Sequence, residues 1–162
     1  MNYFAITKDD MLNGSGLRVV LWVAGCEHHC KGCHNPYTHD VNGGIKFGQD
    51  ALDEIFKELE KDYISGFSVS GGDPLHPENR YEIGQLCKLI KEQYPNKTIW
   101  IYTGYTFEQV KHLEALKYID VLVDGKFVQE LVDVNCEWRG STNQRVINVQ
   151  DSLKLGKVVL ED

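Results

Sequence analysis

Apolar runs alternate with amphipathic stretches along most of the chain. Four short, mostly continuous apolar runs are typical of strands that are covered on both faces. They lie at 17–24, 66–70, 98–102 and 119–123. The stretches between them carry apolar residues at helical spacing, which predicts one apolar face in each. The predicted helices cover 49–62, about 83–94 and 106–117. This alternation predicts an α/β fold with a parallel sheet and right-handed crossovers.

The two ends of the chain and the stretch 36–48 carry weaker patterns. Residues 1–7 predict a short leading strand, and 36–48 is expected to be irregular. Beyond Lys126 we expect a short helix followed by two small strands, at 127–131, 146–149 and 157–160. With 162 residues, of which 42% are hydrophobic, the chain can build a real core. We therefore expect a single domain spanning 1–162.

Composition narrows the classes of partner. No apolar run approaches the roughly 18 residues that a membrane span needs, and the first residues lack a basic segment followed by a hydrophobic one. A net charge of −7, without a block of Lys or Arg, argues against a nucleic-acid partner. Five cysteines without a pairing pattern indicate a reducing compartment. We expect a cytoplasmic protein that acts on small molecules or on another protein.

Three of the five cysteines fall within eight residues, directly after the predicted strand 17–24. Cys26, Cys30 and Cys33 lie among polar residues, which is unusual for buried apolar thiols. A disulfide between two of them would leave the third thiol unpaired. A zinc site would need a fourth ligand such as a neighbouring His, and this alternative stays open. An iron-sulfur cluster normally takes four cysteines, so three would leave one iron open for chemistry.

Further candidate residues follow the other predicted strands, where ligands gather in parallel α/β folds. Gly71, Gly72, Asp73 and Pro74 follow the second strand. The glycines permit close approach to a ligand and the Asp can accept from an amine, although Gly-Gly-Asp-Pro is also a plausible tight turn. Two further turns could line the same pocket or be simple strand ends, namely 102–105 and 123–125.

The remaining Cys and His residues are interpreted as residues that do not bind the metal. Cys87 lies on the apolar stripe of the predicted helix 83–94, which is typical of a core thiol, and Cys136 is interpreted as a buried thiol rather than a fourth ligand. No carboxylate stands at a fixed spacing from the nearby histidines, so most of them are interpreted as surface or supporting residues. These are His28, His29, His39 and His76.

The Cys-x3-Cys-x2-Cys spacing after the first apolar strand resembles that of the radical S-adenosylmethionine enzymes. The resemblance implies an incomplete β/α barrel with mostly parallel strands, and an oxidoreductase that cleaves S-adenosylmethionine to methionine and a 5′-deoxyadenosyl radical. It implies that a 4Fe-4S cluster is held by Cys26, Cys30 and Cys33. Many members place an aromatic residue just before the third cysteine, where this chain has Gly32.

The same resemblance assigns the S-adenosylmethionine contacts. The glycine-rich turn is similar to the family's Gly-Gly-Glu motif, which binds the methionyl amino group, with Asp replacing Glu. The expected contacts are Gly32, Cys33, His34, Gly71, Gly72, Asp73 and Pro74. Because a complete barrel takes about 250 residues, this chain can build only an open one. A wide lateral opening could admit a loop of another protein.

Several segments are similar to those of the activating enzymes of the anaerobic (class III) ribonucleoside-triphosphate reductase. They are 13–18, 33–35, 71–75, 121–127 and 138–145. This resemblance implies removal of hydrogen from a glycine α-carbon of the reductase, with reduced flavodoxin as the electron donor. The polar run 138–145 suits a partner contact or a hydrogen-bonded cap equally well. The alternatives are an activase of pyruvate formate-lyase, a small-molecule radical enzyme such as a deazapurine synthase, and a zinc-binding adaptor.

Overall fold

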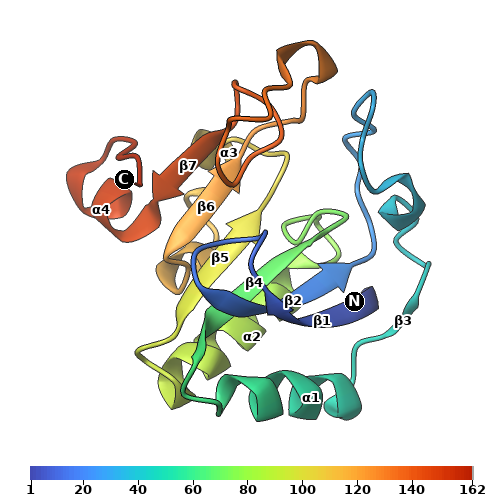
Figure 1. Cartoon of the computed structure of the whole chain (residues 1–162), viewed down its shortest axis with the longest axis vertical. Helices are drawn as coiled ribbons and strands as arrows, with labels where there is room; N and C mark the ends of the chain where they lie inside the picture. Colours follow the sequence, from blue (N-terminus) through green and yellow to red (C-terminus); the bar gives the residue numbers. More distant parts are fainter. Residues whose placement is uncertain (162) are drawn as a thin grey trace.

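A seven-stranded mixed sheet runs through the middle of the molecule, in a computed structural model that describes residues 1–161 (Figure 1). Its strands are β1 (Asn2–Asp10), β2 (Leu17–Val23), β3 (Ile45–Lys46), β4 (Ile64–Gly71), β5 (Thr98–Tyr102), β6 (Val121–Asp124) and β7 (Arg145–Asn148). They are ordered β3-β1-β2-β4-β5-β6-β7. Each of the four apolar runs that predict strands forms one, and the leading strand extends three residues further than expected.

The middle of the sheet is parallel and its edges are antiparallel. Strands β2, β4, β5 and β6 pair in parallel, as their alternation with helices predicts. At one edge β1 runs antiparallel to β2 and β3, and at the other β7 runs antiparallel to β6. The connection 11–16 between β1 and β2 is too short for a parallel crossover, which requires a dozen residues or more. The predicted α/β class is thus confirmed, and barrel curvature stays a prediction.

The described residues form four α-helices and three 3-10 turns, and the last of these helices follows the last strand. The helices are α1 (Gln49–Leu59), α2 (Arg80–Gln93), α3 (Phe107–Val110) and α4 (Val149–Leu155). The 3-10 turns are η1 (Pro36–Thr38), η2 (Glu114–Lys117) and η3 (Gln129–Leu131). The first two helices confirm the predicted ones, and η3 lies within the short helix expected at 127–131. Among residues 1–161, no helix combines the length and the apolar character that crossing a bilayer requires.

The predicted helix 106–117 is wrong beyond its first turn. Its capping box is present, because Thr106 and Gln109 bond each other's backbone. The helix nevertheless ends at Val110, and Leu113 is extended before η2 begins. The inward residues here are spaced three apart, which matches 3-10 geometry better than the 3.6 residues of an α-helix turn.

The C-terminal region contains a helix that the apolar pattern does not predict. The side chain of Asn148 accepts from the amide of Asp151 and starts α4, and Gly156 ends it in the left-handed conformation at φ 69°. The strand expected at 146–149 is present as β7, one residue earlier. The strand expected at 157–160 is reduced to a single bridge between Ile147 and Leu160.

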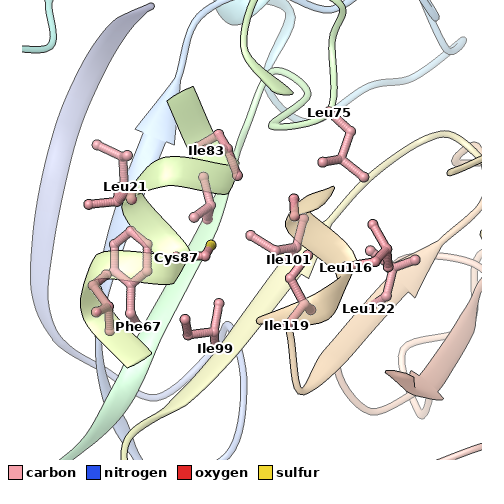
Figure 2. Packing of buried hydrophobic residues seen from close by; sticks show 14 of the residues in the cluster. Leu21, Phe67, Leu75, Ile83, Cys87, Ile99, Ile101, Leu116, Ile119 and Leu122 are labelled. Atoms are coloured by element: carbon pink, nitrogen blue, oxygen red, sulfur yellow. The ribbon is translucent and has the colours of Figure 1, made fainter. Parts of the chain in front are cut away.

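The helices cover one face of the sheet. The main hydrophobic cluster joins the strands to α1, α2 and α3 through residues such as Ile55, Ile83 and Phe107. Figure 2 shows Cys87 on α2 among the buried side chains of this face, which confirms it as a core thiol. A second, small cluster is centred on Trp100, and no helix of the described chain contributes to it. The two faces of the sheet therefore differ, and only one carries the helices.

Arg18 is fully buried where the turn 11–16 meets the sheet. Its guanidinium donates five hydrogen bonds to uncharged oxygens, on Ser15, Phe67, Ser68 and Thr98. It also lies 5.7 Å from the centroid of the Trp100 ring. Burial lowers the pKa of Arg18 to about 10, so the side chain stays charged at neutral pH. This single side chain ties three neighbouring strands together at the face without helices.

Replacing Arg18 with Met should lower the free energy of unfolding by roughly 2–4 kcal/mol, because the buried oxygens would lose their donors. Urea unfolding followed by circular dichroism measures this change. Lys57→Met is the matched control at an exposed site and should change stability by less than about 0.5 kcal/mol. Equal unfolding midpoints for the two variants would show that the guanidinium does not hold the strands together.

Candidate functional site

The cysteine loop leaves the carboxyl end of β2 and lines a cavity of about 170 Å³. All three predicted ligands, Cys26, Cys30 and Cys33, contribute to its wall. The loop is fixed to the chain that follows it, because the amides of Gly25 and Cys26 donate to the carbonyls of Thr38 and His39 at 2.7 and 3.1 Å. The structure thus brings the three cysteines to one cavity at the predicted end of the sheet.

The three thiols are half-buried and unpaired by disulfides. Burial raises the pKa of Cys26 to about 11, so this thiol is protonated at neutral pH and must lose its proton to bind a metal. The amide of Asn35 donates to the sulfur of Cys33 at 3.4 Å, a contact that suits a thiolate. Within residues 1–161, no three His, Cys, Asp or Glu side chains converge closely enough for a single metal ion.

The glycine pair at the end of β4 is required by close packing of the backbone. A Cβ on Gly71 would lie 2.7 Å from backbone atoms of Val23, and a Cβ on Gly72 would lie 2.6 Å from the carbonyl oxygen of Gly25. Gly71 also has a φ of 106°, which L-residues rarely adopt. The amides of Gly72 and Asp73 donate to Val23 and Gly25 at 2.9 and 2.7 Å. The glycines therefore join this turn to the start of the cysteine loop.

Asp73 is buried beneath the same cavity, with 1% of its surface exposed. Its carboxylate accepts from the amides of Leu75 and Gly104 at 2.9 and 3.0 Å, and from the hydroxyl of Thr103 at 2.8 Å. The imidazole of His28 lies 2.6 Å from it. His28 therefore has a carboxylate partner that its spacing in the sequence does not indicate, because the partner comes from a strand end 45 residues away.

Both of the other candidate turns reach the cavity. Tyr102, Thr103 and Gly104 from the end of β5 line it, as does Gly125 after β6. The hydroxyl of Tyr102 is buried and lacks a hydrogen-bond partner among the described residues. The turns at the ends of β5 and β6 therefore line the same cavity as the three cysteines.

Phe127 is a cavity residue that the sequence does not single out. Its ring lies 4.9 Å from that of His34, between centroids, and both residues line the cavity. Phe127 also packs within about 3 Å of the position that a Cβ would occupy on Gly140. The contact could not be found from spacing, because Phe127 lies in an irregular segment after β6.

The polar segment 138–145 forms a hydrogen-bonded cap beside the cavity. The side-chain oxygen of Gln144 accepts from the amides of Gly140 and Ser141, both at 3.0 Å. Its amide nitrogen donates to the carbonyl of Gly125 at 3.0 Å. Because Gly140 and Gln144 also line the cavity, this cap is part of the site wall.

An ion pair holds the end of this cap against the sheet. Arg145 donates to both carboxylate oxygens of buried Asp124, at 2.6 and 3.1 Å, and to Glu108 at 2.7 Å. These bonds raise the pKa of Arg145 and lower that of Glu108. The other Asp124 interaction is with the amide of Phe107, so Asp124 fixes β7 and α3 rather than facing the cavity.

One further prediction needs correction. Cys136 was expected to be buried, but it is half-buried and lines a second cavity next to the cysteine site. His29 and His39 pack edge to face at 5.0 Å between ring centroids, and burial lowers the pKa of His39. His76 accepts from the amide of Glu78 at the start of the turn before α2. Neither His39 nor His76 lines the cysteine cavity.

The chain is similar to known proteins over most of its length. Residues 12–147 match the family model described as a 4Fe-4S single cluster domain. Three relatives carry the name anaerobic ribonucleoside-triphosphate reductase-activating protein. The relative from Enterobacteria phage T4 is 46% identical over 94% of this chain and 97% of its own. Those from Vibrio cholerae and Escherichia coli K12 are 45% and 44% identical, over 89% and 90% of this chain and 96% and 97% of theirs. The chain therefore belongs to the family of anaerobic ribonucleoside-triphosphate reductase-activating proteins that carry a 4Fe-4S single cluster domain.

Proposed function

We propose that this protein activates an anaerobic ribonucleoside-triphosphate reductase by creating a glycyl radical on it, as a radical S-adenosylmethionine oxidoreductase of the cytoplasm. The observation that carries the proposal is the shared cavity of the three cysteines and the Gly71–Asp73 turn. The names of the relatives supply the partner protein. The electron donor that we propose is reduced flavodoxin.

The cluster would be held by Cys26, Cys30 and Cys33. Each lines the cavity, and the other two cysteines do not, since Cys87 is in the core and Cys136 lines the neighbouring cavity. A 4Fe-4S cluster bound here would therefore have one iron without a cysteine ligand. When bound, the cluster would supply the electron that cleaves S-adenosylmethionine to methionine and a 5′-deoxyadenosyl radical.

The chain would hold S-adenosylmethionine through two turns. Gly32, Cys33 and His34 belong to the cysteine loop, and 71–74 forms the turn packed against it. Asp73 already accepts from donors of its own chain, and these bonds fix the turn that would bind the methionyl amino group. Phe127 and Gln144 also line the cavity, where they would keep water from a reactive carbon radical.

The reaction with the reductase tests the proposed function directly. The iron-reconstituted protein, mixed anaerobically with S-adenosylmethionine, a reductant and the reductase, should give a glycyl radical signal in electron paramagnetic resonance. Omitting S-adenosylmethionine is the control and should abolish the signal. A signal with pyruvate formate-lyase and none with the reductase would assign the protein to the other activase class. Tight binding of zinc without any iron-sulfur absorbance would indicate the adaptor.

Replacing Cys30 with Ala should reduce 5′-deoxyadenosine production under dithionite to the level of the iron-free protein, because two thiolates cannot hold the cluster. Chromatographic analysis of the products measures the loss. Cys87→Ala is the matched control, since Cys87 is a core residue away from the cavity, and it should keep its activity if circular dichroism shows a folded protein. Production of 5′-deoxyadenosine by the Cys30 variant would contradict the assigned ligands.

Replacing Asp73 with Asn should weaken binding of S-adenosylmethionine and lower the free energy of unfolding by about 1–3 kcal/mol, because an amide nitrogen would face buried donors. Equilibrium dialysis and urea unfolding measure the two effects. Glu78→Gln, at an exposed position between this turn and α2, is the control and should change neither. Binding equal to that of the wild type would remove Asp73 from the site.

A further inference from the structure

His28 lies between the first two predicted cluster ligands, in a segment that backbone hydrogen bonds do not shape. No amide or carbonyl of residues 27–29 bonds another backbone group within the described residues 1–161. His29 has a φ of 51°, in the left-handed region that non-glycine residues rarely adopt. Side-chain contacts must therefore hold this segment in place.

The ring of His28 contacts the turns that follow two other strands. Its side chain is 6% exposed, and its Nε2 lies 2.6 Å from Oδ2 of Asp73, in the turn after β4. The ring packs edge to face on Tyr105, at 4.5 Å between centroids. It also fills the space beside Gly104, where a Cβ would clash with the imidazole. One side chain of the cysteine loop thus joins the turns after β4 and β5.

The contact between His28 and Asp73 completes the hydrogen bonds of a buried carboxylate. Because a carboxylate only accepts, Nε2 of His28 carries the proton of this bond. The other donors to Asp73 are the hydroxyl of Thr103 and the amides of Leu75 and Gly104. A carboxylate has about four lone-pair sites, so these donors together fill it. Among them, His28 is the donor that belongs to the cysteine loop.

We propose that His28 is a positioning residue for S-adenosylmethionine, which acts through its hydrogen bond to Asp73 and fixes the turn 71–74 relative to the cluster ligands. This inference rests on the proposed function. It assigns a role to a side chain of the cysteine loop other than those of the three cysteines.

The place of His28 in the loop explains why a second connection to the turn is needed. The backbone already joins the turn to the loop at Gly25, where the amide of Asp73 donates at 2.7 Å. That bond lies before the first ligand, Cys26, whereas His28 lies beyond it. Burial raises the pKa of Cys26, and the amides of His28 and His29 offset part of that rise. The loop is therefore held against the turn on both sides of the first ligand.

Two amide substitutions separate the hydrogen bond from the ring packing. Both His28→Gln and His28→Asn remove the imidazole, but only the longer glutamine reaches the place of Nε2 and can still donate to Asp73. His28→Asn should raise the KM for S-adenosylmethionine about tenfold and keep kcat within about threefold, because it loosens the binding turn rather than the cluster. His28→Gln should keep its KM within about threefold of the wild type. His112→Asn, at an exposed histidine, is the control and should match the wild type.

Hydrogen exchange reports on the turn itself, without relying on activity. It is measured anaerobically by mass spectrometry on the iron-reconstituted protein, with iron content recorded for every variant. The amides of Gly72 and Asp73 should exchange about tenfold faster in His28→Asn than in the wild type, because the turn opens more often. In His28→Gln they should exchange at the wild-type rate.

Two outcomes would overturn the positioning role. One is that His28→Asn and His28→Gln have the same KM and the same exchange rates, because the hydrogen bond to Asp73 would then have no effect of its own. The other is that both variants lose their iron, which would place His28 in the support of the cluster instead. Either outcome, with a wild type that still cleaves S-adenosylmethionine, leaves the proposed function intact. A wild type that produces no 5′-deoxyadenosine would instead remove the proposed function.

Discussion

The site depends on the close approach of two turns at the ends of neighbouring parallel strands. Gly71 and Gly72 pass so near to Val23 and Gly25 that a Cβ on either glycine would clash with backbone atoms. The backbone bonds from Gly72 and Asp73 then fix the beginning of the cysteine loop. Because parallel pairing sets the register of β2 against β4, the position of the first cysteine is determined by the sheet rather than by a flexible loop.

The asymmetry of the sheet explains how such a small chain can offer an accessible site. Helices α1 and α2 pack on one face and bury most of the core there, which leaves the other face to aromatic residues, Arg18 and a second cavity that adjoins the cysteine cavity. On that face no helix of the described residues packs against the strands, and hydrogen bonds from Arg18 connect three of them instead. The same face can therefore remain open while the sheet stays well ordered.

The sequence predicts the features that depend on local periodicity and spacing. The apolar patterns predict strand β5 and helix α1, and the spacing of the three cysteines indicates a candidate cluster site. It does not predict the pairing of His28 with Asp73, which requires knowledge of which strand ends are neighbours. Nor does it predict Phe127, which lies in an irregular segment. Helix α4 was missed although Asn148 and Gly156 mark its ends, because its apolar pattern is short.

The C-terminal cap couples the last strand to the site wall. Arg145 begins β7 and bonds Asp124 at the end of β6, while the adjacent Gln144 bonds Gly140 and lines both cavities. A buried carboxylate paired with a guanidinium holds its geometry more strictly than an exposed pair, because leaving either charge unpaired there is costly. The position of Gln144 is consequently set by the edge of the sheet. The segment 138–145 is therefore a hydrogen-bonded cap whose inner side forms part of the cavity wall.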